Sequence, residues 1–582
     1  MRRSLRLAPL ARLAPLALLA PLALAPLAAC GSSGTNASSS PDGSASSSSG
    51  GSSSGASGGG GSSSGGSSSG GGGSGGSSSG GSSSGGDDGG GADAGPPVGA
   101  SVLQFHNHVN RDGFFVDKAI TETAAATFIR DTSFAGTVTG NVYASPVYVE
   151  NGVGGKGTFY LATEAGTVFA LDETTGAVDW QKNVATPPDN TGAGCGNITP
   201  IGITGTPAID LATRLIVFDS AVADTNNNIQ THMIYALSID TGAVAWSLDA
   251  STMKDPTGLA FSPQPQNERG AVLIVNGVAY VPYGGHYGDC GTYHGWVIGV
   301  PLSGTGAKAW ATQVAGAGIW GPGGAASDGQ SIYVTTGNGE GGSKTTWAES
   351  EGIFRLDPGP TFANTTSDYF APYNWADLDD SDVDLSGSGP LVIDAPSMTP
   401  STLVMAQGKD GYLYLNDRLA LGGIATQAKL ATVGALQVQS GEITNGGAWA
   451  TIGGVTYVVV RPNGTNPAIG CPNNTSGDLI VVKLDPTAAQ KMTPVWCASS
   501  GGVGSPSITS SDGVAADPLV WVFAADKGNQ LFAWDLVSGT QIYKGGGTGD
   551  TAANVRRFTT PIAVHGRMFV GGDGQLYAYK AN

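Results

Sequence analysis

The sequence predicts an all-β protein, a β-propeller with eight four-stranded blades. Three observations predict this fold: a strand–turn–strand motif recurs along the chain, a small or hydroxyl residue followed by proline opens a series of apolar strands, and charged residues are scarce. Lys, Arg, Asp and Glu make up 12% of the chain, about half the usual fraction, which argues against long surface helices. Seven blades with one irregular insertion are the alternative.

Residues 1–29 have the pattern of a signal peptide. Three arginines within the first six residues precede an apolar stretch that ends Leu-Ala-Ala-Cys at Cys30. This ending resembles the bacterial lipobox, in which the Cys is lipidated and the chain is cut before it. The alternative is an ordinary secretory peptide with a chance Cys. The resemblance implies a lipid anchor at Cys30, and Gly31 favours the outer membrane, with the body on its periplasmic or outer side.

Residues 30–98 are dominated by Ser and Gly. Such a chain buries too little apolar surface to fold, so we expect a flexible linker with a root-mean-square span of roughly 45 Å. The folded body then covers residues 99–582. The linker either gives the body reach toward a partner or is a simple spacer.

The net charge of the chain limits the classes of molecule that it can bind. The formal net charge is −18, and an acidic body does not attract nucleic acid or anionic lipid through its general field. Apart from the N-terminal segment, no stretch is long and apolar enough to span a bilayer. We therefore expect no nucleic-acid partner, and membrane contact only through the anchor.

The repeated motif is clearest at residues 167–180 (TVFALDETTGAVDW) and 233–246 (MIYALSIDTGAVAW), and weaker copies end at Trp310 and Tyr543. The shared Gly suits a tight turn that needs positive φ. The Trp that ends each strong copy is a large flat surface, which we expect to dock between neighbouring sheets.

Eight strand openings follow one another at intervals of roughly 40 to 65 residues, within the range of repeat lengths for propeller blades. They are Ser145-Pro146, Thr206-Pro207, a strand near Ala271, Gly321 to Gly324, Ser388 to Pro390, Gly446-Gly447, Ser505-Pro506 and Thr560-Pro561. The last unit, residues 558–580, has room for three strands only. We expect the early strand 101–105 to supply the fourth and to close the ring by pairing the two ends of the chain.

The spacing Ala-x-Asp-x-x-x-Gly-x-x-x-Trp resembles the tryptophan-docking repeat of the pyrroloquinoline-quinone (PQQ) type propellers, in the quinoprotein alcohol dehydrogenase-like superfamily. Over residues 101–582 the chain is similar to bacterial PQQ-like repeat lipoproteins of unassigned activity. The segments that carry this likeness are LQFHNHVNRDG at 103–113, ITPIGITGTPAID at 198–210, YHGWVIG at 293–299, GIWGPGGAASDGQSIYVTTGNG at 318–339 and GKDGYLYLNDR at 408–418. The resemblance implies the fold but little about function, because cofactor-free assembly scaffolds share these repeats.

The resemblance also implies where a quinone site would lie. In the family, calcium is held by a Glu, an Asn in a Thr-Gly-Asn turn and a downstream Asp, and a basic residue touches the quinone. Asn338 and Lys409 match the Asn and basic positions, and the acidic run 377–384 lies near the Asp position. The Glu, the adjacent-cysteine disulfide and a Cys-x-x-Cys-His haem motif have no counterpart. The alternative is that Asn338 and Lys409 are inherited with the fold.

Asp380, Asp382 and Asp384 alternate within the acidic run and could surround a hard cation such as calcium. Leu385 stands where an EF-type loop needs Gly, which favours the other interpretation, a solvated acidic loop. Apart from Cys30, the cysteines are Cys195, Cys290, Cys471 and Cys497. In an exported protein these persist as disulfides; we expect the pairs 195–290 and 471–497, with the two other connectivities open.

The function expected from the sequence is a lipid-anchored, non-catalytic binding or scaffold module of the cell envelope. Its channel mouth and loops, including the insertion 339–384, would contact an envelope protein or glycan. The alternative is a PQQ- and calcium-dependent dehydrogenase of alcohols or sugars that uses Asn338, an Asp of the run 377–384 and Lys409. The residues alone imply no cofactor. A hydrolase or lyase has no supporting constellation, because no Gly-x-Ser-x-Gly elbow precedes a helix pattern and no Cys/His spacing matches a zinc site.

Overall fold

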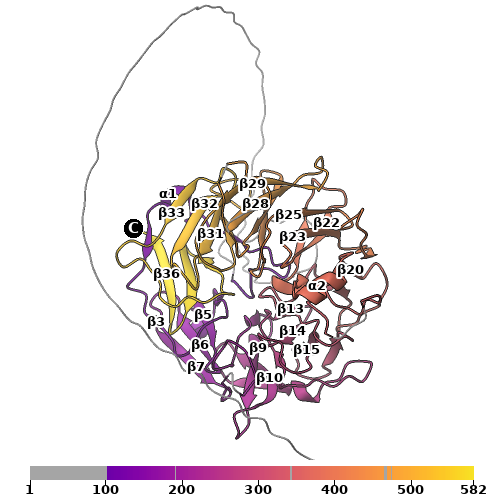
Figure 1. The fold of residues 1–582 in the computed structure, drawn as a ribbon. Helices are drawn as coiled ribbons and strands as arrows, with labels where there is room; N and C mark the ends of the chain where they lie inside the picture. The colour runs from indigo at the N-terminus through magenta and orange to yellow at the C-terminus, as the bar shows by residue number, and fades with distance from the viewer. Residues whose placement is uncertain (1–100, 190–191, 341–343, 465–467, 474) are drawn as a thin grey trace, which may run out of the picture. The chain divides into compact units, whose positions relative to one another are not determined.

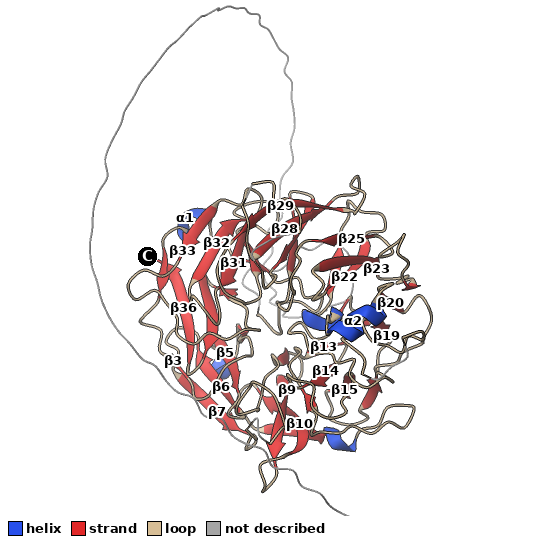
Figure 2. Cartoon of the chain, viewed as in Figure 1, coloured by secondary structure: helices blue, strands red, loops and turns tan. Residues whose placement is uncertain are grey.

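The computed structural model describes residues 101–582, apart from 190–191, 341–343, 465–467 and 474. The predicted signal peptide, Cys30 and most of the Ser/Gly linker lie outside the described residues. Eight β-sheets form a ring of blades (Figures 1 and 2), so the prediction of an eight-bladed propeller is confirmed. Among the described residues, no helix is both long and apolar enough to cross a membrane.

The first four blades follow the order of the chain from the inside of the ring outward. Blade 1 is β4 (Val147–Val149), β5 (Thr158–Thr163), β6 (Thr167–Asp172) and β7 (Val178–Asn183); blade 2 is β8 (Ala208–Asp210), β9 (Leu215–Ala223), β10 (Ile229–Ser238) and β11 (Val244–Asp249). Blade 3 is β12 (Gln266–Asn267), β13 (Leu273–Val275), β14 (Val278–Gly285), β15 (Trp296–Pro301) and β16 (Lys308–Ala311). Blade 4 is β17 (Ala326–Ser327), β18 (Ile332–Thr335), β19 (Ile353–Leu356), β20 (Tyr369–Ala371) and the parallel edge strand β24 (Gly423–Ile424).

The last four blades keep this plan, and blades 7 and 8 also take strands from the N-terminal part. Blade 5 is β21 (Leu391–Asp394), β22 (Thr402–Gln407), β23 (Tyr412–Asp417) and β25 (Gly434–Gln437); blade 6 is β26 (Ala448–Ile452), β27 (Val455–Val460), β28 (Leu479–Leu484) and β29 (Met492–Ala498). Blade 7 is β30 (Ser507–Ser510), β31 (Leu519–Phe523), β32 (Leu531–Asp535) and β33 (Gln541–Lys544), with β1 (Phe114–Val116) parallel to β30. Blade 8 is β34 (Ile562–Val564), β35 (Arg567–Gly572) and β36 (Gln575–Ala581), with β2 (Phe128–Arg130) and β3 (Gly136–Thr137).

Helical segments are short and lie between the strands. They are α1 (Glu122–Ala125), α2 (Trp375–Ser381) and the 3₁₀ turns η1 (Val153–Gly155), η2 (Ala250–Thr252) and η3 (Leu385–Gly387). The apolar core lies between neighbouring blades: Tyr160 of blade 1 belongs to the same buried cluster as Phe218 of blade 2, for example. Because each blade buries its faces against the next, the centre of the ring is left for polar groups.

The eight predicted openings each precede the innermost strand of a blade, and the structure explains their hydroxyl residues. The N–H of Ser145 donates to Thr206 Oγ1 of the next blade at 2.9 Å, and the N–H of Thr560 donates to Ser145 Oγ at 3.0 Å. The N–H of Gly446 donates to Ser505 Oγ at 2.9 Å. These hydroxyls satisfy buried backbone donors and join adjacent blades around the channel.

The predicted docking of Trp side chains between blades is confirmed. The indole N–H of Trp180 donates to the carbonyl of Ile239 in blade 2 at 2.9 Å, and Trp246 donates to Leu302 in blade 3 at 2.8 Å. Gly242 is required at its turn, because it has positive φ and a Cβ there would lie 2.7 Å from the Trp180 ring. The sequence comparison missed Trp496, which docks on blade 7 in the same way.

The two ends of the chain do close the ring, but the strand predicted for this role was wrong. The last sheet is completed by β2 and β3, which pair antiparallel with β36. Val102, in the segment 101–105, instead forms a bridge with Tyr148 of blade 1. This segment is drawn into the ring because its apolar side chains, Val102 and Phe105, are both buried.

Residues 102–113, which we term the central segment, cross the middle of the ring (Figure 1) and bind one blade after another. The backbone carbonyls that accept from the innermost strands are Leu103 (from Ile209 N–H), Val109 (from Ser327), Asn110 (from Val392), Asp112 (from Trp449) and Gly113 (from Ile508), at 2.8 to 3.1 Å. Arg111 is buried and donates to the carbonyls of Phe105, Val272 and Ala325. The central segment therefore links blades 1 to 7 at the axis of the propeller.

Both predicted disulfides are present. Cys195 pairs with Cys290 and Cys471 with Cys497, with Cα–Cα distances of 5.9 and 5.8 Å, normal for a disulfide. The first disulfide joins a loop of blade 2 to the β14–β15 loop of blade 3, and the second lies within blade 6. The expectation that they staple loops is confirmed for the first disulfide, whereas the second ties the β27–β28 loop to strand β29.

Candidate functional site at the channel mouth

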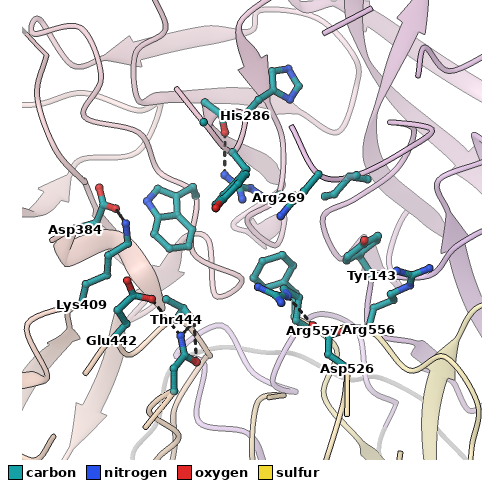
Figure 3. Close-up of a pocket in the computed structure, with 18 of the residues that line it drawn as sticks. Tyr143, Arg269, His286, Asp384, Lys409, Glu442, Thr444, Asp526, Arg556 and Arg557 are labelled. Carbon is teal, nitrogen blue, oxygen red and sulfur yellow. Dashed lines mark hydrogen bonds and ion pairs between the residues drawn. The ribbon is translucent and has the colours of Figure 1, made fainter. Parts of the chain in front are cut away.

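A cavity of about 910 Å³ opens at the end of the channel where the innermost strands begin. Its walls come from segments that precede those strands, as Trp320 precedes β17 and Asp384 precedes β21, and from loops that follow the second strands, as Lys409 follows β22. Figure 3 shows Arg269, Asp384 and Arg556 converging from different blades. A propeller places the equivalent segment of every blade around one axis, so residues far apart in sequence meet here.

The lining mixes aromatic rings, amides and charged groups. The aromatic residues are Tyr143, Tyr287, Tyr293, Trp320 and Phe558; the amides are Asn197, Asn338, Asn463, Asn529 and Asn554; the cations are Arg269, Lys409, Arg556 and Arg557; the carboxylates are Asp289, Asp382, Asp384, Glu442 and Asp526. Burial lowers the pKa of the further lining residue His286 to about 3, so its ring is neutral at physiological pH. The carboxylates outnumber the cations in this lining.

The structure brings Asn338 and Lys409, the two residues matched to a quinone site, into this cavity together with Asp382 and Asp384. The N–H of Asn338 donates to Asp384 Oδ1 at 2.8 Å. Gly337 is required in the Thr-Gly-Asn turn, because a Cβ there would lie 2.1 Å from the same carboxylate oxygen. The matched turn is therefore built around Asp384.

Lys409 is held by two carboxylates. Its Nζ forms ion pairs with Asp384 and, at 2.8 Å, with Asp382 (Figure 3 shows the first). Burial alone would lower the pKa of Lys409, but the two carboxylates outweigh burial and raise it. Burial raises the pKa of Asp384, and Lys409 opposes that shift. Lys409 is therefore a fixed cation at the wall of the cavity.

The three aspartates proposed as calcium ligands lie in different surroundings. Asp380 is in helix α2, half exposed, and pairs with Lys344, whereas the Asp382 side chain is 64% exposed and that of Asp384 only 3%. The predicted solvated loop is partly wrong, because residues 375–381 form α2 and bury Trp375 and Leu378. Within the described residues, no group of three His, Cys, Asp or Glu side chains is arranged to hold a metal.

The residues present do not fit a calcium ion beside Asn338. Both oxygens of Asp384 have partners, the Asn338 N–H and the Lys409 ammonium. A carboxylate from blade 3 does reach the cavity, since Asp289 lines it and accepts a hydrogen bond from Tyr293 at 2.7 Å. Arg269, however, lies close enough to Asp289 and Asp384 for both to raise its pKa against the larger lowering effect of burial. The ammonium of Lys409 therefore already neutralises the carboxylate of Asp384 that calcium would need.

Trp320 provides a flat surface close to two cationic side chains. The Arg269 guanidinium carbon and the Lys409 Nζ each lie 5.3 Å from the centre of its ring, within the range of cation–π attraction. A planar or apolar face of a ligand can stack on such a ring while polar substituents reach the cations.

Further charges of the cavity come from blades 6 to 8 and are mostly paired. Arg557 pairs with Asp526 at 2.7 Å, and Arg556 binds Asp573 through two nitrogens while its guanidinium lies 5.6 Å from the Tyr143 ring. Asn463, in blade 6, donates to Thr444 and Glu442, two other lining residues. These pairs hold the side chains in fixed orientations around the opening.

Arg269, Trp320 and Asp289 were not picked out from the sequence as site residues. Arg269 and Trp320 lie just before predicted inner strands, and Trp320 falls within a segment that carried the family resemblance. Their position relative to the strand openings is the signal that could have found them. Asp289 follows no such rule, because it lies in a long loop whose path is set by the 195–290 disulfide.

Comparisons with known proteins agree with this geometry at the level of the fold. Residues 152–288 match the family model described as outer membrane protein assembly factor BamB. Similar solved structures include quinohemoprotein alcohol dehydrogenase from Comamonas testosteroni, with 15% identity, a TM-score of 0.57, and 82% of this chain and 80% of that chain covered. Quinohemoprotein alcohol dehydrogenase ADHIIG from Pseudomonas putida HK5 has 13% identity, a TM-score of 0.56, and 83% and 80% covered.

A europium-containing methanol dehydrogenase is also similar, with 13% identity, a TM-score of 0.55, and 81% of this chain and 89% of that chain covered. No curated protein sequence matches the chain. The chain is therefore an eight-bladed β-propeller in which residues 152–288 are similar to the BamB family model. It shares its fold with the quinohemoprotein alcohol dehydrogenases, which agrees with the resemblance seen in the sequence. At these sequence identities, the solved structures show similarity of the fold alone.

Proposed function

We propose that this chain is a non-catalytic binding or scaffold module of the cell envelope, and that the channel mouth with its surrounding loops contacts an envelope protein or glycan. One observation carries the proposal: the ammonium of Lys409 forms ion pairs with Asp382 and Asp384, the carboxylates that a dehydrogenase would need for calcium. The cavity is thus equipped to hold a partner by charge, stacking and hydrogen bonds.

The location in the cell belongs to the same proposal. Cys30 carries the lipid that anchors the protein to the outer membrane, and residues 30–98 connect this anchor to the propeller. The support is the lipobox-like ending of the signal segment and the Ser/Gly composition of the linker. The body then lies on the periplasmic or the outer side of that membrane.

A direct test places a photo-cross-linking residue at Tyr287, on the lip of the cavity and 66% exposed. The control is the same residue at Val514, which is 64% exposed and lies in the β30–β31 loop, outside the cavity lining. Cross-links to an envelope component from Tyr287 and none from Val514 support the proposal. Equal labelling from both positions contradicts it.

The second candidate is a PQQ- and calcium-dependent dehydrogenase of alcohols or sugars. It is favoured by the convergence of Asn338, Asp384 and Lys409 with Trp320 in one cavity. Isothermal titration of the full chain in detergent with PQQ, with and without calcium, separates the two candidates. We expect no saturable binding up to high micromolar PQQ.

Calcium-dependent binding that is lost in Asn338→Ala and Lys409→Ala, together with dye reduction, would establish the dehydrogenase instead. The matched control is Lys344→Ala, which also removes a lysine paired with an aspartate of the acidic run. Lys344 does not line the cavity, so this variant should titrate like the unmodified chain.

A further inference from the structure

Arg269 differs from the other cations of the mouth in its partners. Lys409, Arg556 and Arg557 each form an ion pair, whereas within the described residues no carboxylate comes within ion-pair distance of Arg269. Its Nη2 donates to the carbonyl of Gly285 at 2.9 Å, and its buried Nε has no partner in the described part of the chain. A guanidinium in this state can bind an incoming carboxylate through two parallel hydrogen bonds.

The ring next to this cation indicates the shape of the ligand. Trp320 lies 5.3 Å from the Arg269 guanidinium carbon and lines the same cavity. A ligand that sets a carboxylate on Arg269 therefore has an apolar face within reach of the indole. The C–H face of a sugar ring that carries a carboxylate has both features.

The remaining lining suits hydroxyl groups better than further negative charges. Asparagine amides both donate and accept hydrogen bonds, and carboxylates such as Glu442 and Asp289 accept them, so together they can satisfy the hydroxyls of a sugar. The same carboxylates repel a ligand with several negative charges. A planar tricarboxylate such as PQQ meets this repulsion, whereas a ligand with one carboxylate and many hydroxyls does not.

We infer that the channel mouth binds an oligosaccharide that contains a uronic acid, with the carboxylate on Arg269 and the C–H face of the acidic sugar on Trp320. This inference rests on the proposed function and names the ligand class of its binding surface. The cavity of about 910 Å³ lies at the upper end of the range for small-ligand pockets, which suits a short oligosaccharide better than one sugar.

The test is isothermal titration of the full chain in detergent with three probes: an aldotriouronic acid (xylobiose carrying one glucuronic acid), its methyl ester, and xylotriose. We expect saturable binding of the aldotriouronic acid that weakens as salt is raised, and binding at least tenfold weaker for the uncharged ester and for xylotriose. Equal binding of the three probes would overturn the role of the carboxylate. Absence of binding to all three would overturn the inference as a whole.

The variants test the two named contacts. Arg269→Gln should weaken binding of the aldotriouronic acid at least tenfold, and Arg269→Lys should restore part of it. Trp320→Leu keeps the cation and should weaken the acid and the ester by the same factor; it serves as the second variant if Arg269→Gln does not fold. The matched control is Arg130→Gln, which removes an arginine lying 4.6 Å from the centre of the Tyr577 ring, outside the cavity lining. Equal loss of binding in Arg130→Gln and Arg269→Gln would refute the assignment.

The outcomes separate this inference from the proposed function. Failure of every probe to bind, with cross-linking at Tyr287 intact, overturns the uronate ligand and leaves the binding module in place. Cleavage of the aldotriouronic acid, detected as new reducing ends, would overturn the non-catalytic function while the ligand class stands.

Discussion

The tryptophans that dock between blades differ in burial, so their replacement should reduce the stability of the propeller by different amounts. Trp496 is 1% exposed and donates to the carbonyl of Leu536 in the next blade at 2.8 Å, whereas Trp180 occupies the same position between blades 1 and 2 but is only half-buried. We predict that Trp496→Ala destabilises the propeller by about 4 kcal/mol, since replacing a buried Trp by Ala typically costs about 3 to 5 kcal/mol. Trp180→Ala should cost about half as much because part of its ring is already in contact with water.

The Trp496→Phe variant separates the packing contribution of Trp496 to stability from the contribution of its hydrogen bond. It keeps a ring between the blades but leaves the carbonyl of Leu536 without its donor, which costs about 1 to 3 kcal/mol when the group is buried. The expected order of destabilisation is therefore Trp496→Ala, then Trp180→Ala and Trp496→Phe, with the unmodified chain most stable.

Thermal unfolding followed by near-ultraviolet circular dichroism measures these effects. A domain of roughly 480 residues has an unfolding entropy of about 1 kcal/mol/K, so 4 kcal/mol corresponds to a fall in Tm of about 4 °C. Urea unfolding at fixed temperature provides an independent value. Equal losses for Trp496→Ala and Trp180→Ala, or a loss below about 1 kcal/mol for the former, would refute burial at the blade interface as the origin of the stability.

Three further predictions concern buried charge, the central segment and the anchor. Burial raises the pKa of Glu164 to about 7, so its contribution to stability is complete below about pH 4.5 and is lost as the pH rises through 7. Relative to Glu164→Gln, the unmodified chain should lose about 3 kcal/mol of unfolding free energy across this pH window, measured by urea titrations. Parallel pH profiles of the two proteins would contradict this. Arg111→Ala removes the donors to the carbonyls of Val272 and Ala325. Amide hydrogen exchange should therefore accelerate in β13 and β17 but not in outer strands such as β7. An equal acceleration in inner and outer strands would exclude a linking role for the central segment. Cys30→Ser should move the protein from the membrane fraction to the soluble fraction, and its retention in membranes would disprove the lipid anchor.

The fold was largely readable from the sequence because its signals are local. The turn Gly, the following Trp and the hydroxyl–Pro openings recur within each unit, so eight blades could be counted without knowing their arrangement. The ring closure was harder to predict. Residues 101–105 and 128–130 are both short and apolar, and the choice between them depends on which one reaches β36 and which is buried at the axis.

Only part of the candidate site could be predicted from the sequence, because most of its contacts join distant segments. Asn338 and Lys409 were found through a short motif each, and the structure places both at the mouth. The ion pair of Lys409 with Asp384, and the approach of Arg269 to the Trp320 ring, join different blades. Such contacts between distant segments leave no local pattern in the chain.

The sequence by itself determined the class of fold and favoured eight blades, because repeated turns and alternating apolar strands are properties of neighbouring residues. Only the tertiary structure decided that residues 102–113 fill the axis, and that Arg269, which has no ion pair within the described residues, lies beside the Trp320 indole at the mouth. Burial, ion pairing and cavity shape arise when eight blades converge on one axis, and each blade supplies only a small part of them.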